Sequence, residues 1–117
     1  MTEETERGLK CCPEPEPAPE LDMRPVEGAA ADDELALLAK AVAHPARLRI
    51  LRLLSRREAQ GCSQIVGELP LAQSTVSEHL RILKESGLIR SREEGARVEY
   101  CINSPVLRRF KALVAIL

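Results

Sequence analysis

The sequence predicts a winged helix-turn-helix, a mainly α (α+β) fold with about five helices and a two-stranded β-hairpin wing. Between residues 62 and 86 a short helix, a tight turn and a longer helix follow one another, and two strand-like runs around a glycine come next. The longer helix carries Val76, Leu80 and Leu83 at i, i+4 and i+7, the spacing of a stripe that packs on a core. It begins with small polar side chains, which can hydrogen-bond base edges and phosphates without filling the groove. Together these features predict DNA binding.

Length and composition fit one compact domain with a tail. The 117 residues are 44% hydrophobic but only 2% aromatic, so the core must consist of Leu, Ile, Val and Ala. Stacking on single-stranded bases needs aromatic side chains and is therefore not expected. No apolar run approaches the roughly 20 residues of a membrane span, and residues 1–12 lack the pattern of a signal peptide. We expect a cytoplasmic protein without a membrane partner.

The net charge of −1 hides two oppositely charged parts. Residues 1–34 hold 3 basic and 11 acidic side chains, whereas residues 35–117 hold 14 basic and 7 acidic ones. The basic part can be drawn toward phosphate and the acidic part is repelled from it. Residues 1–31 also contain five of the eight prolines, so we expect a flexible acidic arm over 1–31 and a folded DNA-binding and dimerisation domain over 32–117.

Within the domain, helices are expected over 35–43, 46–57, 64–68 and 72–86. Asp32 or Asp33 is a candidate cap for the first, Ser63 for the third, and Gly87 suits the left-handed position after the fourth. Strands are expected over 88–92 and 97–102 around a turn at 93–95. Ser104 then caps a last helix that has Pro105 at its first position.

The last helix carries more apolar side chains than one short helix can bury in so small a domain. With a matching stripe on the first helix they predict a two-fold homodimer, which would set two recognition helices about 34 Å apart, facing a palindromic operator. The alternative is that they close the core of the monomer. The residues are Val106, Leu107, Phe110, Leu113, Val114 and Leu117, with Leu35, Leu38 and Val42 on the first helix.

Three segments of the chain resemble the ArsR/SmtB family of bacterial metal-responsive repressors. They are KAVAHPARLRILRLL, LPLAQSTVSEHLRILKESGLI and REEGARVEYCIN, and the S-x-H-L-x-x-L-x-x-x-G-L pattern at Ser77–Leu88 is the most specific part. The resemblance covers roughly residues 33–117. It implies a homodimeric winged-helix repressor that binds operator DNA without its inducer and leaves the DNA when the inducer binds.

The family's sensing sites differ between members. A zinc or nickel site on the last helix needs His, Asp and Glu, none of which occurs in residues 104–117, and the C-x-C pair of another site type has no counterpart in residues 63–70. What remains is Cys11-Cys12 in the arm and Cys62 just before the helix-turn-helix, a layout that resembles a subset of arsenical repressors.

Three thiols suit trivalent arsenic. As(III) is soft and prefers sulfur, and three thiolates complete its pyramidal coordination. The expected site is therefore Cys11, Cys12 and Cys62 with As(III), or Sb(III), as inducer and no organic cofactor. Cys101 is interpreted as an ordinary strand residue, and His44 as a local hydrogen-bonding residue. The predicted DNA contacts are Gln73, Ser74, Thr75, Ser77, Glu78, His79, Arg81, Arg92 and Arg97. For Glu78 a solvent-exposed role is the alternative, and for His79 helix packing.

Other interpretations stay open. The same fold could sense cadmium(II), lead(II) or bismuth(III), or respond to thiol oxidation. An enzyme that uses Cys11-Cys12 as a redox pair is not expected, because the chain lacks a C-x-x-C motif, a phosphate-binding loop and a base fixed beside a nucleophile.

Overall fold

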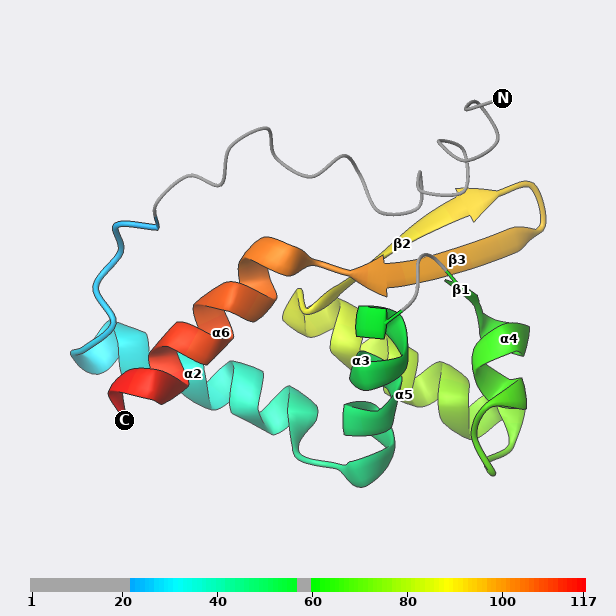
Figure 1. The fold of residues 1–117 in the computed structure, drawn as a ribbon, viewed down its shortest axis with the longest axis horizontal. Coiled ribbons are helices and arrows are strands. Elements are labelled where there is room, and N and C mark those ends of the chain that lie inside the picture. Colours follow the sequence, from blue (N-terminus) through cyan, green and yellow to red (C-terminus); the bar gives the residue numbers. More distant parts are fainter. Residues whose placement is uncertain (1–21, 57–59) are drawn as a thin grey trace.

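The computed structural model describes residues 22–56 and 60–117, which form five helices and a three-stranded antiparallel sheet (Figure 1). The helices are α2 (Ala29–Val42), α3 (Pro45–Arg56), α4 (Cys62–Gly67), α5 (Gln73–Ser86) and α6 (Ser104–Ile116). The strands are β1 (Gln60–Gly61), β2 (Ile89–Glu94) and β3 (Arg97–Ile102). The predicted winged helix-turn-helix is confirmed, with α4 and α5 as its two helices and β2–β3 as the wing. Within the described residues no helix is long and apolar enough to cross a membrane.

The core is aliphatic, as the composition predicts, and lies between the helices and one face of the sheet. The predicted stripe of α5 is fully buried, since Val76, Leu80 and Leu83 are each 0% exposed. Removing side chains of this size from water stabilises the fold by about 1.5–3 kcal/mol each. Further fully or nearly fully buried members of the cluster come from α3, α4, the entry to the wing and α6: Ile50, Leu54, Ile65, Leu88, Ile89 and Leu113.

The first helix begins earlier than the sequence predicts. α2 starts at Ala29, after Gly28 with φ of 106°, and the Asp32 N–H donates to the Gly28 carbonyl over 2.9 Å. A positive φ suits glycine, and the alanines that follow are the strongest helix formers, so the helix extends past the expected caps at Asp32 and Asp33. Residues 22–31 of the expected arm therefore include a helical turn.

Residues just before α2 are anchored on the last helix. The Arg109 side chain of α6 is 4% exposed and donates to the backbone carbonyls of Arg24 and Pro25 and to the Glu34 carboxylate, at 2.7–3.0 Å. The carboxylate of Asp22 lies 3.9 Å away. Because Arg109 supplies hydrogen bonds and charge, the pKa of Glu34 is lowered. This ion-pair cluster fixes where the N-terminal segment leaves the domain.

The sheet differs from the predicted hairpin by one short strand. β1 pairs with β3 through Gln60↔Tyr100 and Gly61↔Glu99, which gives the order β1-β3-β2. β1 leads directly into α4, whose cap is Gly61 rather than the predicted Ser63, and the Gly61 N–H donates to Gln64 Oε1 over 2.7 Å. Pairing with the wing thus holds the helix-turn-helix against the sheet.

Gly87 ends α5 as predicted, with φ of 91° and its N–H donating to the Lys84 carbonyl. The wing turn consists of residues 95 and 96 rather than 93–95, because β2 continues to Glu94, and Gly95 takes φ of 63°. The last helix has Asn103, not Ser104, as its cap residue.

Candidate nucleic-acid interface

The start of α5 presents the polar surface that the sequence predicts. Gln73, Ser74, Thr75, Ser77 and Glu78 are all exposed, while Val76 between them is fully buried. The buried side of the helix rests on the core, so the polar side stands on a rigid base. A helix that exposes its first two turns in this way has the geometry that winged-helix proteins use to enter the major groove.

An ion-pair ladder continues this exposed face toward the end of the helix. The Arg81 guanidinium binds the carboxylates of Glu78, at 2.5 Å, and Glu85, at 2.8 Å. Arg81 lowers the pKa of Glu78, mainly through this hydrogen bond. All three side chains are more than half exposed, so these pairs are weak and can exchange for phosphate contacts. Arg81 is a predicted phosphate contact, and its charge is already shared between two acids.

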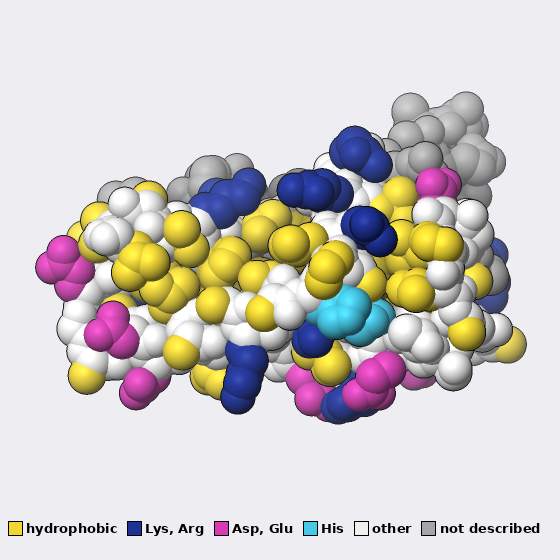
Figure 2. Space-filling view, turned by 90° about the horizontal axis from the view of Figure 1, so that it is seen from below, with side chains coloured by type: hydrophobic (Ala, Val, Ile, Leu, Met, Phe, Trp, Pro, Cys, Tyr) yellow, Lys and Arg dark blue, Asp and Glu magenta, His cyan; other side chains and the backbone are white. Residues whose placement is uncertain are grey.

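His79 is the buried member of the predicted contact set. It is 8% exposed, and its ring lies 4.5 Å from that of His44, centroid to centroid, at an interplanar angle of 47°. Burial, His44 and Arg47 together lower the pKa of His79, with burial as the largest cause. This geometry supports the packing interpretation. The prediction for His44 is confirmed, because its Nδ1 accepts a hydrogen bond from the Ala46 N–H at the start of α3. Figure 2 shows the histidines between hydrophobic and basic side chains.

Arg47 is a candidate contact that the sequence did not single out. It precedes Leu48 in α3, yet its charge acts on both Glu78 and His79 of α5. Its Nε is buried and has no hydrogen-bond partner within the described residues. A guanidinium beside the recognition helix is suited to a phosphate near that helix. The signal in the sequence is its place directly after His44-Pro45-Ala46, which only the fold brings next to α5.

The two predicted wing arginines lie on one side of the hairpin. Arg92 pairs with Glu99 in the β-ladder, and paired residues of antiparallel strands share a face. Arg97, two residues before Glu99, shares that face too, and its guanidinium lies 3.3 Å from the Glu99 carboxylate. Arg97 is exposed, and Arg92 is half-buried. Both arginines therefore share one face of the wing with Glu99.

The predicted thiol site is placed only in part. Cys62 is the first residue of α4. Cys11 and Cys12 fall outside the described residues. Within residues 22–56 and 60–117 no group of three or more His, Cys, Asp and Glu side chains is arranged to hold a metal ion. Any site of the predicted kind therefore needs the arm.

An apolar surface runs along α2 and α6, on the side seen in Figure 2. Leu37 is 68% exposed and Leu117 92%, with Val114 and Ile116 also exposed. Of the predicted dimer residues, Leu38 and Leu113 are buried in the monomer core, while Val114 and Leu117 remain uncovered. Leu37 also lines a groove on α2 beside Lys40 and Ala43. Some of these residues thus close the core of the monomer, and others leave an apolar face exposed.

Comparisons with known proteins agree with this architecture. The family model of a bacterial regulatory protein, arsR family, matches residues 44–91. The transcriptional repressor PagR of Bacillus anthracis is 40% identical over 80 residues, covering 68% of this chain and 79% of PagR. A solved structure described as a possible transcriptional regulator for arsenical resistance has a TM-score of 0.62 and 30% identity, covering 68% of this chain and 80% of the other. Reduced HlyU from Vibrio cholerae has a TM-score of 0.62 and 28% identity, covering 74% and 92%.

Proposed function

Because this chain belongs to the ArsR family of bacterial transcriptional regulators and is not an enzyme, we propose that it is an arsenic-responsive repressor. It binds a palindromic operator as a homodimer and leaves the DNA when As(III), or Sb(III), binds the thiolates of Cys11, Cys12 and Cys62. The observation that carries the DNA-binding half of the proposal is the exposed polar start of α5 on a fully buried apolar stripe.

Several charges support the mode of DNA contact. Gln73, Ser74 and Ser77 read the groove from α5, and Arg81 contacts phosphate. The wing arginines Arg92 and Arg97 hold the backbone to one side. Arg47 adds a cation at the base of the recognition helix. Phosphate contacts of this kind give affinity that falls steeply with salt, whereas the small side chains on α5 give the sequence preference.

The exposed leucines and valine on α2 and α6 support the dimer. Leu37, Val114 and Leu117 form an apolar surface across two helices that pack on each other. A surface of this kind costs free energy in water and is covered when two copies associate about a two-fold axis. The dimer then presents two α5 helices to successive turns of the major groove.

The donor set supports the inducer. Three thiolates satisfy As(III), whereas zinc favours four N or S ligands in a tetrahedron. The length of the arm bears on which Cys62 is used. Asp22 lies against Arg109, so Cys12 stands ten residues from an anchored position and reaches about 33 Å at ~3.3 Å per residue. In Figure 1, α4 and the start of the described chain lie at opposite ends of the domain. The longest dimension of the domain is 44 Å, which exceeds the reach of the arm. This difference favours an arm that binds Cys62 of the second subunit.

Capture of the arm would bring acidic side chains beside the start of the helix-turn-helix. Negative charge near phosphate and a shifted α4 both disfavour the DNA-bound state. A coupling free energy of about 1–3 kcal/mol lowers operator affinity roughly 5- to 150-fold, a typical allosteric response.

The test is release of a labelled palindromic operator, followed by fluorescence anisotropy during titration with arsenite under reducing conditions. Wild type is compared with single serine variants at Cys11, Cys12, Cys62 and Cys101. We expect arsenite to release wild type and Cys101→Ser but none of the other three. A Cys62→Ser variant that still responds would show that Cys62 is not a ligand. Wild type that ignores arsenite but releases DNA with cadmium(II), lead(II) or bismuth(III) would refute the arsenic assignment.

A further inference from the structure

We propose that the outer face of the wing sheet is a docking surface for the chain's own acidic arm, with Cys101 as its covalent anchor. Under oxidising conditions Cys101 and one of the two arm cysteines, Cys11 or Cys12, form a disulfide. The arm then covers the arginines of the wing. This site shares the arm cysteines with the proposed arsenic site but uses Cys101 in place of Cys62.

The position of Cys101 is the first reason. Tyr100 and Ile102 on β3 pack against the core, so Cys101 between them points to the opposite, outer face of the sheet. It is nevertheless only 1% exposed, although it does not belong to the core cluster. Cys101 is also disulfide-bonded. The interpretation of Cys101 as an ordinary strand residue does not account for a bonded, covered thiol on the outer face.

The strand register limits the choice of partner. The chain has four cysteines, so the partner is Cys11, Cys12 or Cys62. Gly61 pairs with Glu99, which places the Cα of Cys62 three residue steps along the sheet from that of Cys101, or about 10 Å. Two cysteines whose Cα atoms are more than about 7 Å apart cannot be bridged without backbone movement. The partner is therefore in the arm.

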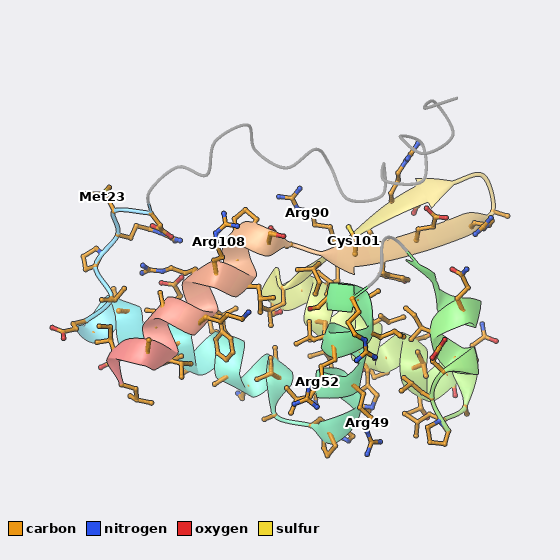
Figure 3. The ribbon with its side chains drawn as sticks, viewed as in Figure 1. Met23, Arg49, Arg52, Arg90, Cys101 and Arg108 are labelled. Atoms are coloured by element: carbon orange, nitrogen blue, oxygen red, sulfur yellow. The ribbon has the colours of Figure 1, made fainter. Side chains whose placement is uncertain are left out.

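The arm can reach Cys101 within one subunit. Asp22 lies against Arg109 of α6, and the ten residue steps from Asp22 to Cys12 span up to about 33 Å. In Figure 3 Met23 lies at one end of the domain and Cys101 near its middle, at the junction of β3 and α6. α4, with Cys62, lies beyond it toward the far end in Figure 1. Cys101 is thus nearer to the root of the arm.

Charge favours the same arrangement. Arg90 pairs with Cys101 and Arg92 with Glu99, so both arginines share the outer face with Cys101 and Arg97. Figure 3 shows Arg108 of α6 on the same side of the molecule as Arg90. Glu99 offsets part of this charge through its ion pair with Arg97. Residues 1–21 hold six acidic and two basic side chains, a net charge of −4. An acidic segment and an arginine-rich face attract each other at the ionic strength of a cell.

The chemistry needs an oxidant, which we take to be a hydroperoxide. One thiolate attacks the peroxide oxygen and becomes a sulfenic acid, with release of water when hydrogen peroxide is used. The second thiol displaces a second water and forms the S–S bond, so two thiols and one hydrogen peroxide give one disulfide and two waters. Positive charge next to a cysteine favours the reactive thiolate form, and the arginines of the outer face supply it.

The effect on DNA rests on the proposed function, because Arg92 and Arg97 are proposed backbone contacts. An arm held at Cys101 places carboxylates over these arginines and removes them from the phosphates. The disulfide itself does not depend on that function, so the two claims can be measured separately.

The full-length protein is reduced, freed of reductant and treated with hydrogen peroxide. Its remaining free thiols are then alkylated, and the protein is digested with trypsin without reduction. Trypsin separates the cysteines into three peptides, 11–40, 58–81 and 98–108. Mass spectrometry should find 11–40 linked to 98–108, and a non-reducing gel should show the monomer band. The Cys62→Ser control should keep this link, and Cys101→Ser should lose it. A link from 58–81 to 98–108, or a reaction confined to 11–40, would overturn the proposal.

A charge variant tests the docking surface without removing a thiol. We expect Arg108→Glu to slow formation of the link several-fold at low salt, and the difference to vanish at about 1 M salt, where charges are screened beyond ~3 Å. Arg52→Glu makes the same charge change on α3, on the other side of the domain in Figure 3, and should leave the rate unchanged. Equal rates for all three proteins would refute electrostatic docking. If the linked protein forms but binds operator as tightly as the reduced protein, the wing is not covered.

Discussion

The ion pairs on the exposed face of α5 lead to a quantitative prediction for DNA affinity. Glu78, Arg81 and Glu85 carry a summed charge of −1 on the face that we propose to turn toward DNA, and Arg81 binds both carboxylates. In Glu78→Gln the sum becomes zero, and Arg81 loses its partner on the side nearer the start of the helix. We expect tighter operator binding, because a negative charge leaves the interface and Arg81 becomes free to neutralise one further phosphate.

The magnitude follows from counterion release. One additional phosphate contact makes the slope of log affinity against log salt steeper by about 0.9. Between 50 and 200 mM salt the variant should therefore lose roughly 3.5-fold more affinity than wild type, with its largest advantage at the low-salt end. The measurement is an operator titration by fluorescence anisotropy at four or more salt concentrations. A scrambled duplex serves as the non-specific reference.

Glu85→Gln is the matched control, since Glu85 binds the same guanidinium but lies two turns further from the start of α5. Its gain in affinity should be smaller. If Glu78→Gln has an unchanged salt slope, Arg81 is not limited by Glu78 and the reasoning fails. If instead Glu78→Gln binds the operator more weakly but the scrambled duplex as before, Glu78 accepts a hydrogen bond from a base, as a contact to cytosine would require.

Three further predictions concern stability and assembly. The pKa of His79 is lowered in the folded state, so the unfolded chain binds the proton more readily below its own pKa of about 6.5. The free energy of unfolding should therefore be constant above that pH and fall below it, by at most about 1.36 kcal/mol per pH unit. Urea titrations between pH 7.5 and 5 should show this pH dependence in wild type and lose it in His79→Gln. In Gly87→Ala the new Cβ meets no atom closer than Val106, at 3.9 Å, but a non-glycine residue must adopt φ of 91°. The variant should lose about 1–2 kcal/mol of unfolding free energy in a urea titration. The control, Gly67→Ala at the end of α4, should be neutral or more stable by up to ~1 kcal/mol. Leu37→Glu should raise the dimer dissociation constant on the order of 10²-fold or more by sedimentation velocity, because a two-fold axis repeats the change in both copies, while Leu48→Glu on α3 should not.

Most of the fold could be predicted from the periodicity of the sequence. The stripe of α5, the glycine that ends it and the alternating wing strands each depend on neighbours a few residues apart, so local pattern is sufficient to locate them. β1 was missed because two residues have no period, and it exists only through pairing with Tyr100 and Glu99. The early start of α2 has no polar cap to mark it, because the helix begins with alanines after Gly28 and not at Asp32 or Asp33.

The candidate site divides in the same way. The exposed polar residues of α5 could be predicted because the buried stripe fixes which side of the helix faces outward. The place of Arg47 could not, since it follows from the packing of α3 against α5, which no local spacing encodes. For His79 the sequence left a DNA contact and helix packing open, and only that packing of helices decides between them. The cluster around Arg109 joins residues separated by 75 to 85 positions and likewise has no local signal.

That cluster links the two proposals for the arm thiols. Because Arg109 holds Asp22 on α6, Cys12 can move no more than about 33 Å from that point. This limit distinguishes two partner thiols by their distance. Cys101 of the same chain is the near one, and Cys62 of a second copy is the one that a dimer would bring within range. A disulfide at Cys101 consumes one thiol of the vicinal pair, so the oxidised protein cannot offer three thiolates to As(III). The two states must therefore exclude each other in one arm, and peroxide-treated protein should bind less arsenite than the reduced protein, in proportion to the linked fraction.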